Sequence, residues 1–400
     1  MKREYDCIVA GAGLAGFAAA ISAARCGASV LLIDKLPCVG GTAVYTITPV
    51  ISGWGEYDRG EAVAKMLSDK LAEMNALVTR PCGRIITDEV SLQKAMISIL
   101  SGFEIDTLYN ATVCGAERQG DRITSVTVMT NGGLVEYNGK SFVDATGDAV
   151  LSRLAGAEIL TPDPDESMTK TLMFKVRNVE NFDRDTVKAQ FNAHVEEFPV
   201  GIQNAFMGLP LVDHNEILLN LTAVTGDASN PEDMSKMYTE LYSQISPVME
   251  YLRKYVSCFA NAVVSKVAPV VGVRYTCSVK GLRKLTIEDM HDPQMPPEPV
   301  TYCGSYIGGH YVKQYSSPWG REITGNPAIP YGSIRVDGIS NLLTAGRIID
   351  VDPKVISAVR MGAQCLGTGQ AAGIAAALGV PEYPELLKEL ERQGCMTWLK

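Results

Sequence analysis

The start of the chain switches between short apolar runs and small residues. Residues 5–10 (YDCIVA) form an apolar run typical of a buried parallel strand. An alanine-rich stretch at residues 17–26 favours a helix, and residues 29–33 (SVLLI) predict a second strand. The sequence GAGLAG separates the first strand from the helix. This pattern predicts a β–turn–α–β unit.

The turn has the spacing of a dinucleotide-binding fingerprint. Gly11, Gly13 and Gly16 match G-x-G-x-x-G, and Asp34 ends the second strand about twenty residues later. The glycines permit a tight turn, a close approach of backbone to a pyrophosphate, and close packing of helix on strand. The helix N-terminus offers unpaired N–H groups to the phosphates. Because Asp34 would repel a 2′-phosphate, NADP is disfavoured. An ordinary strand–turn–helix is the alternative, but it does not require the complete fingerprint.

A second glycine pair follows the acid. Residues 38–43 read CVGGTA and include Gly40, Gly41 and Thr42. An NAD site has no special need for this pair, whereas an extended FAD runs on past the pyrophosphate and needs close backbone there. The pair therefore favours FAD, with an ordinary Gly-Gly loop as the alternative.

The remaining pattern divides the chain into three regions. Up to residue 160 it predicts helices at 59–74 and 91–100, a strand at 105–109, a β-meander at 111–116, 122–129 and 134–138, and a strand at 141–148. Residues 161–324 alternate predicted helices at 182–198 and 231–255 with a strand at 216–223. After residue 325 come a strand at 341–347 (NLLTAGR) and a long small-residue helix at 357–378.

These regions predict an α/β fold class. A Rossmann-like FAD-binding domain with a β-meander comprises residues 1–160 and 325–400, and an inserted α+β substrate domain comprises residues 161–324. The length of 400 residues also exceeds one compact core and indicates about two domains.

Charge and hydropathy narrow the classes of partner. A net charge of −9 without any basic run argues against nucleic acid and anionic membrane. The first strand begins by residue 5, which leaves no space for a signal peptide, and no stretch is long and apolar enough to cross a bilayer. We therefore expect a cytoplasmic protein that acts on a small molecule. The oligomeric state stays open.

Cysteine and histidine spacing excludes the common metal sites. No two of the ten cysteines lie within four residues of each other, so C-x-x-C motifs of zinc, iron–sulfur and dithiol sites are absent. The four histidines show no ligand spacing. We expect no metal. No signature of covalent flavin attachment is present, so the expected FAD is non-covalent.

Taken together, the motifs resemble the FAD-dependent oxidoreductases with the glutathione-reductase-like fold. Within them, the chain is most similar to a bacterial group distantly related to the fumarate reductase flavoproteins. The signature runs through GAGLAG, Asp34, VGGTA, FVDATGD, NLLTAGR and a closing GQAAGIAAAL helix. Residues 271–289 (VGVRYTCSVKGLRKLTIED) and 329–334 (IPYGSI) are similar to two further stretches of that group.

The resemblance implies a set of FAD contacts along the chain. They are Gly11, Gly13, Leu14, Ala15, Gly16, Asp34, Lys35, Gly40, Gly41, Thr42, Ala145, Thr146, Gly147, Gly346, Arg347 and Asp350. Many relatives carry Gly-Asp where this chain has Gly346-Arg347. Arg347 can pair with phosphate, and Asp350 can take over the hydrogen bonding of that acid. The helix from Ser357 would aim its N-terminus at the pyrimidine end of the flavin.

Three positions depart from the group. Tyr275 and Cys277 stand where it has Glu and Arg, and Gly332 stands where it has Arg. These changes remove charge from the side expected to face the substrate, which disfavours a simple dicarboxylate.

The candidates for catalysis come from the later part of the chain. His310 has a near-neutral ordinary pKa and follows two glycines, so it suits proton transfer, with Tyr311 beside it. Arg274 and Arg360 can steady a carboxylate or the reduced flavin, or form structural ion pairs. His291 is the weaker histidine candidate, in a proline-rich loop.

Aromatic residues suggest an aromatic or hydroxylated substrate. Tyr302, Tyr306, Tyr311, Tyr315 and Tyr331 cluster in the sequence, and Tyr45 and Trp54 follow the second glycine pair. An ordinary interface or core cluster is the alternative for both groups.

We expect an FAD-dependent oxidoreductase, either a dehydrogenase or a reductase, that transfers a hydride between a small organic substrate and flavin N5. Two alternatives remain: a reductase fed with electrons by a protein partner, and a flavoprotein whose FAD is structural or does no net redox chemistry. Substrate, direction and electron partner stay open.

Overall fold

The computed structural model describes residues 2–52, 62–80, 84–163, 166–201, 205–211, 216–303, 308, 310, 323 and 325–395. Trp54, Tyr306, Tyr311 and Tyr315, which the sequence singled out, lie outside these residues.

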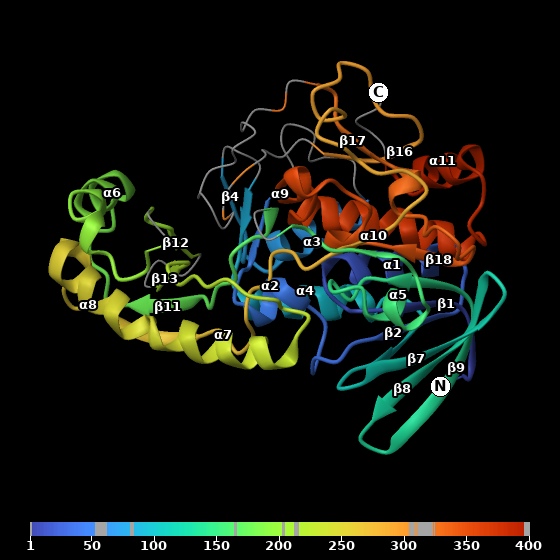
Figure 1. The fold of residues 1–400 in the computed structure, drawn as a ribbon, viewed down its shortest axis with the longest axis horizontal. Coiled ribbons are helices and arrows are strands. Elements are labelled where there is room, and N and C mark those ends of the chain that lie inside the picture. Colours follow the sequence, from blue (N-terminus) through green and yellow to red (C-terminus); the bar gives the residue numbers. More distant parts are fainter. Residues whose placement is uncertain are drawn as a thin grey trace.

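A seven-stranded sheet, called here the large sheet, lies on the right of the molecule in Figure 1. Its order is β6-β2-β1-β9-β8-β7, with β18 also pairing with β9. The bounds are β1 Glu4–Ala10, β2 Val30–Ile33, β6 Ile105–Leu108, β7 Thr112–Gln119, β8 Arg122–Thr130, β9 Gly133–Asp144 and β18 Leu342–Thr344. Strands β6, β2, β1, β9 and β18 are parallel, and β7, β8 and β9 form the predicted antiparallel meander.

Strand β9 joins the meander to the parallel strands. Its first half pairs antiparallel with β8, and its second half pairs parallel with β1, from Asn138 opposite Glu4 to Asp144 opposite Ala10. Separate strands at 134–138 and 141–148 were therefore the wrong prediction. Pairing with β1 keeps the chain extended up to Asp144, after which residues 145–148 form a turn.

Helix α1 (Leu14–Arg25) and helix α10 (Gly362–Ala377) pack against each other beside the large sheet (Figure 1). Small residues make this contact possible. A Cβ built on Gly369 would lie 2.0 Å from the carbonyl oxygen of Ala15, and one on Gly373 would lie 2.1 Å from that of Ala19. Neither position of α10 can carry a side chain at this packing distance.

The predicted helix at 357–378 is broken in two. Helix α9 (Ile356–Val359) ends before Arg360, Met361 has extended backbone, and α10 begins at Gly362. The break packs on β3 (Val50–Ile51): the Ala363 N–H donates to the carbonyl of Ser52 at 3.1 Å. A Cβ on Gly362 would lie 2.8 Å from Ile51. Tertiary contact therefore outweighs the helical propensity of this stretch.

A four-stranded antiparallel sheet, called here the small sheet, has the order β12-β13-β11-β14. Its strands are β11 Phe174–Arg177, β12 Gly208–Pro210, β13 Glu216–Leu219 and β14 Val263–Val267. Helices α7 (Pro231–Ser243) and α8 (Ile245–Tyr255) lie along one side of it, and α6 (Arg184–Asn192) lies at its far end (Figure 1). The single helix predicted at 231–255 is two helices that meet at Gln244. The helix predicted at 182–198 is shorter.

Smaller elements complete the described chain. They are α2 Gly41–Tyr45, α3 Ala62–Glu73, β4 Val78–Arg80, β5 Arg84–Ile86, α4 Glu89–Leu100, α5 Val150–Leu154, β10 Ile159–Leu160, β15 Ser278–Val279, β16 Pro299–Tyr302, β17 Ala328–Pro330 and α11 Tyr383–Arg392. None of the described helices combines the length and apolar composition that crossing a membrane requires. The cytoplasmic location stays a prediction.

A buried ion cluster ties the small sheet to α4. Glu89, the first residue of α4, lies 2.7 Å from Lys175 Nζ on β11 and 2.8 Å from Lys266 Nζ on β14. The Glu89 and Lys175 side chains are only 8% and 5% exposed. The proposed domain boundaries at residues 160 and 324 stay a prediction; Tyr275 and Leu285, inside them, belong to the same core as Val9.

Candidate functional site

One cavity of about 1,000 Å³ brings together residues from distant parts of the chain. This volume is at the upper end of the range of about 300–1,000 Å³ seen for ligand pockets. One side is formed by the glycine turn, the second glycine pair, the turn after β9 and the start of α10. The other side is formed by the small sheet and by His310. The cavity is therefore the candidate site for cofactor and substrate together.

The three glycines of the turn have different surroundings. Gly11 has φ +98°, and a Cβ there would lie 2.4 Å from the carbonyl oxygen of Ala145. Gly13 lines the cavity, and a Cβ there would meet nothing closer than Gly41 Cα at 3.8 Å. Gly16 faces away, since its Cβ would lie 1.6 Å from the Gly11 carbonyl oxygen. Glycine at this position allows close packing of α1, and its expected contact with the pyrophosphate stays a prediction.

Asp34 fastens the turn to the end of β2. One carboxylate oxygen accepts the N–H of Ala12, and the other accepts the N–H of Leu36 at 2.7 Å. Burial raises the pKa of Asp34 above its ordinary value, although these two hydrogen bonds lower it. Asp34 and Lys35 both line the cavity, as do Leu14 and Ala15 at the start of α1.

The second glycine pair lies opposite the first turn. Gly41 has φ +50°, and a Cβ there would lie 2.6 Å from Gly13 Cα, so the two backbones approach closely. Gly41 and Thr42 line the cavity. Gly40 does not; its N–H donates to the carbonyl of Ala12 at 2.9 Å and holds the loop against the turn. Gly40 thus stabilises the contact between the second glycine pair and the first glycine turn.

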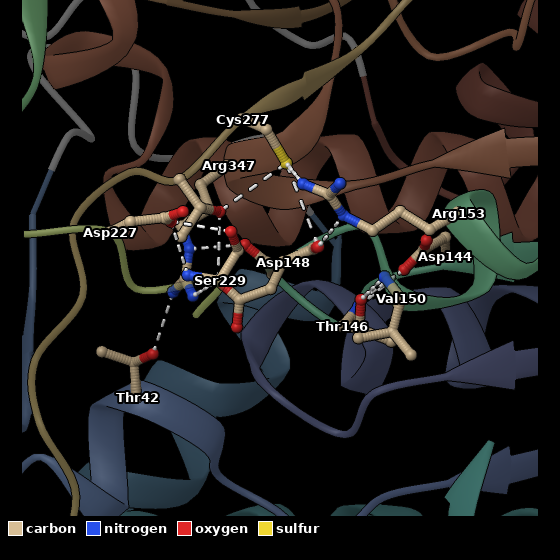
Figure 2. Close-up of polar contacts among 12 residues, drawn as sticks. Thr42, Asp144, Thr146, Asp148, Val150, Arg153, Asp227, Ser229, Cys277 and Arg347 are labelled. Carbon is tan, nitrogen blue, oxygen red and sulfur yellow. Dashed lines mark hydrogen bonds and ion pairs between the residues drawn. The ribbon is translucent and has the colours of Figure 1, made fainter. Parts of the chain in front are cut away.

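Arg347 holds the turn after β9. Its Nε donates to the Gly147 carbonyl at 2.7 Å, its Nη2 lies 2.9 Å from Asp148 Oδ1, and its Nη1 lies 3.4 Å from Thr42 Oγ1 (Figure 2). Burial alone would raise the pKa of Asp148, but the Arg347 guanidinium outweighs it and lowers the pKa. The sequence predicted that Arg347 pairs with a phosphate. In this structure its ion-pair partner is Asp148.

The remaining predicted FAD contacts lie after β9 and after β18, and not all of them line the cavity. Ala145, Thr146, Gly147 and Gly346 line the cavity. Asp350 is not among the lining residues, and its Oδ2 accepts the N–H of Gly281 at 2.9 Å; its expected place at the cofactor stays a prediction.

The three departures from the group do not line the cavity either. Tyr275 and Cys277 are buried, and a Cβ on Gly332 would meet Arg283. The sequence placed these positions on the side facing the substrate, and the packing around them corrects that placement.

His310, Arg274 and Arg360 come together on the cavity wall. Burial, Arg274 and Arg360, in that order, lower the pKa of His310 well below its ordinary value. The backbone of His310 is left-handed, with φ +69°, and its carbonyl accepts the N–H of Thr169 at 2.8 Å. Arg274 Nη1 donates to the Thr169 carbonyl at 2.5 Å. A strained backbone in a non-glycine residue is found preferentially at functional sites.

Most of the other aromatic and histidine candidates lie elsewhere. Tyr45 lines the cavity, and its hydroxyl accepts from Gln93 Nε2 at 3.1 Å. Tyr331 is buried and donates to the carbonyl of Pro381 at 3.2 Å. Tyr302 and His291 do not line the cavity.

Asn220, just after β13, is a cavity residue that the sequence did not indicate. Its side-chain carbonyl oxygen accepts from Arg274 Nη2 at 3.2 Å and from Thr171 Oγ1 at 2.8 Å. Because a guanidinium only donates, this orientation leaves the amide nitrogen of Asn220 as a donor at the cavity wall. No sequence signal identifies such a residue, since its role depends on a contact with Arg274 across the fold.

The family is settled by a sequence profile. The profile described as "FAD dependent oxidoreductase" matches residues 6–390. The chain belongs to the FAD-dependent oxidoreductase family. It is an enzyme family whose cofactor is FAD, as the two glycine motifs indicated.

Curated relatives of this FAD-dependent oxidoreductase match over short segments. It is 34% identical over 112 residues to the "Fumarate reductase (cytochrome)" of Shewanella frigidimarina, covering 28% of this chain and 18% of that protein. It is 50% identical over 42 residues to the "NADH:fumarate oxidoreductase" of Klebsiella pneumoniae (strain 342), covering 10% of this chain and 4% of that protein. The chain thus spans less than a fifth of the length of these relatives.

Solved structures show the fold over nearly the whole chain. A geranylgeranyl bacteriochlorophyll reductase-like protein from Thermoplasma acidophilum has a TM-score of 0.52 at 13% identity, covering 98% of this chain and 83% of that one. The p-nitrophenol 4-monooxygenase of Pseudomonas putida DLL-E4 has a TM-score of 0.54 at 10% identity, covering 98% and 84%. The predicted α/β fold with a Rossmann-like FAD-binding part is confirmed.

The cavity passes a geometric test for FAD. The open space above Gly13 is where a side chain would obstruct a diphosphate, and the α1 N-terminus beside it carries no acidic residue in its first turn. Gly13, Leu14 and Ala15 would hold the diphosphate, and Asp34 would meet the adenosine ribose. The residues present fit the cofactor.

Proposed function

We propose that this enzyme oxidises or reduces a small organic molecule held in the cavity, with a hydride passing between a substrate carbon and flavin N5. When bound, FAD supplies the hydride chemistry. The protein supplies substrate binding and the accompanying proton transfer. The observation that carries the proposal is the meeting of His310, Arg274 and Arg360 in the same cavity as the glycine turn.

His310 is the proposed proton acceptor or donor. Its lowered pKa keeps the imidazole neutral near pH 7, and a neutral imidazole can accept a proton. Arg274 and Arg360 are proposed to bind a negatively charged group of the substrate. An anion seated between them would offset the charges that lower the His310 pKa and raise it toward its ordinary value. Substrate binding would thereby strengthen the base.

The substrate is proposed to be aromatic or hydroxylated. Tyr45 and Phe206 line the cavity and can stack on a ring, and Asn220 can donate to an oxygen. Proteins of the same fold include p-nitrophenol 4-monooxygenase and CabE, an aromatic hydroxylase from angucycline biosynthesis. These likenesses support a small organic substrate of this kind.

Anaerobic absorbance of the FAD-loaded enzyme tests the proposal. A panel of aromatic alcohols, hydroxy acids and enoates is added to the oxidised or photoreduced protein, and the flavin band is followed. We expect at least one compound to bleach or restore the band. We expect H310Q to slow that change by about 10²–10⁴-fold, the usual contribution of a general acid or base. H291Q, outside the cavity, is the matched control and should react like wild type.

The two alternative functions give different outcomes. A reductase fed by a protein partner would not bleach with any compound and would reoxidise with an acceptor after photoreduction; it shares that restoration with the reducing direction of the proposal and differs from a dehydrogenase in its source of electrons. A flavoprotein without net redox chemistry would do neither. Equal rates for H310Q and H291Q would remove His310 from the reaction.

A further inference from the structure

The cavity continues beyond the cofactor side into an arm lined by the small sheet. Its apolar lining comes from β12, from β13 and from the residues next to β11 and β12: Met173, Phe206, Met207, Leu209 and Leu218. Val50 and Val271 extend this lining toward the glycine turn. Binding of an apolar ligand to such a surface is favourable, because it removes apolar surface of both from water. The arm therefore favours a substrate with an apolar body.

Methionines contribute strongly to this arm. Met173 and Met207 directly precede β11 and β12 of the small sheet, and Met234 comes from α7. Methionine is unbranched and polarizable and adapts its shape to irregular partners. The lining thus suits an extended body such as a chain or a ring with a chain.

Two cations line the outer end of the arm. Arg184 and Lys188 are one turn apart on α6, and both side chains are exposed. Within the described chain, neither forms an ion pair with an acidic side chain. Asp183, the N-cap of α6, uses its carboxylate to accept the N–H of Thr186 at 2.9 Å. The chain as a whole carries a net charge of −9, whereas this pair of side chains is positively charged.

Helix α6 lies at the opposite end of the molecule from α1 and β1 (Figure 1). Arg274 and Asn220 are hydrogen-bonded to each other and form a polar group with His310. Asn220 follows Leu219, which pairs with Phe174 at the start of β11, whereas the chain leaves the other end of β11 at Arg177 toward α6. The order along the cavity is therefore polar, then apolar, then cationic.

We infer that the substrate is an elongated amphipathic anion, with an apolar body in the small-sheet arm and a carboxylate or phosphate at the end away from the flavin, held by Arg184 and Lys188. This inference rests on the proposed function in one respect: the molecule bound in the arm is the one that reacts at the polar group.

Calorimetric titration of the FAD-loaded protein tests the inference without turnover. The probes are dodecanoate, dodecyl phosphate and dodecan-1-ol, which share one apolar body and differ in the end group. We expect both anions to bind roughly tenfold more tightly than the alcohol, and the difference to shrink with added salt. In R184E/K188E the preference for the anions falls, and only the part contributed by Arg274 and Arg360 remains, while binding of the alcohol is unchanged.

Two further variants keep the test decisive. K94E/K388E changes the net charge by the same amount at exposed lysines outside the cavity, and it should keep the preference. M173W fills the apolar arm and should weaken all three probes. Equal affinity for anion and alcohol in wild type would overturn the inference, as would a preference that R184E/K188E leaves unchanged. Unchanged binding in M173W, or no saturable binding of any probe, would do the same. None of these results depends on flavin bleaching, so they are distinct from a failure of the proposed reaction.

Discussion

The guanidinium of Arg347 lies 2.9 Å from the carboxylate of Asp148, and their side chains are only 16% and 27% exposed. The same guanidinium donates to the Gly147 carbonyl at 2.7 Å. Arg347 therefore fixes the turn after β9, which lines the cavity.

We predict that R347M lowers the free energy of unfolding of the apoprotein by about 1–3 kcal/mol, because it leaves a largely buried carboxylate without its cation. Urea unfolding at pH 7 measures the change. K280M is the control: its pair with Glu158 is 41% and 60% exposed, so its loss should stay below about 1 kcal/mol. Equal losses for the two variants would contradict the assigned role of Arg347.

The same pair predicts a dependence on pH. The pKa of Asp148 in the folded state lies below its ordinary value of 3.8, so its contribution is fully present above pH 3.8 and is lost as pH falls through the lower folded value. The difference in stability between wild type and R347M should therefore be constant from about pH 6 to pH 8 and shrink in acid. A difference that grows below pH 4 would be the wrong sign.

Substitutions at two glycines of the first turn are expected to affect different properties: FAD affinity at Gly13 and stability at Gly16. G13A places a methyl group in open space, so the apoprotein should keep its stability while FAD affinity falls at least about tenfold, because the methyl group obstructs the diphosphate. G16A forces a Cβ to within 1.6 Å of the Gly11 carbonyl oxygen. It should destabilise the apoprotein by about 1–3 kcal/mol or more. Thermal unfolding and FAD titration measure the two effects, and a reversed pattern would refute the placement of the diphosphate.

Because the pKa of His310 is lowered in the folded protein, we predict that the free energy of unfolding of the apoprotein falls in mild acid. Its folded pKa lies well below the unfolded value of 6.5, so between these values the unfolded chain binds a proton that the folded chain does not. Wild-type apoprotein should lose up to about 1.4 kcal/mol per pH unit below pH 6.5 from this group, and H310Q should lack that component. Urea unfolding at pH 5 and pH 7 compares them. Parallel profiles would show that His310 is not buried beside the arginines.

The ion pair of Glu89 with Lys175 is expected to stabilise the contact between α4 and the small sheet. E89Q should cost about 3 kcal/mol, since it breaks a buried pair and leaves Lys175 partly uncompensated. E89M/K175M should recover most of that loss, because an apolar pair of similar size needs no desolvation of charge. E73Q, in the exposed pair with Lys70, is the control and should change stability by less than about 1 kcal/mol.

Local sequence pattern predicted the elements that depend on local chemistry. The β1–α1–β2 unit, the meander and the tight turn at Gly11 follow from spacing, since strand, turn and helix are contiguous there. The break before Gly362 does not follow from propensity, because it depends on contact with Ile51, a residue far away in sequence. The same applies to Arg347, whose partner Asp148 is reached only through the fold.

The candidate site was predicted in part. The sequence suggested His310, Arg274 and Arg360 by residue type, and their meeting in one cavity is a property of the fold. Asn220 and the cations of α6 carry no motif, because a donor or a charge at a cavity wall has no periodic signature. The hydrogen bond that Asp350 accepts from the N–H of Gly281 also depends on the fold, because the two residues are far apart in sequence.

The most direct measurement is the visible spectrum of the purified protein after apoprotein has been incubated with excess FAD and the unbound cofactor removed. The account predicts a yellow protein that retains one FAD per chain, while G13A treated in the same way retains little. A colourless wild-type protein, or a G13A variant that retains FAD as well as wild type, would contradict the claim that the backbone around Gly13 holds the diphosphate.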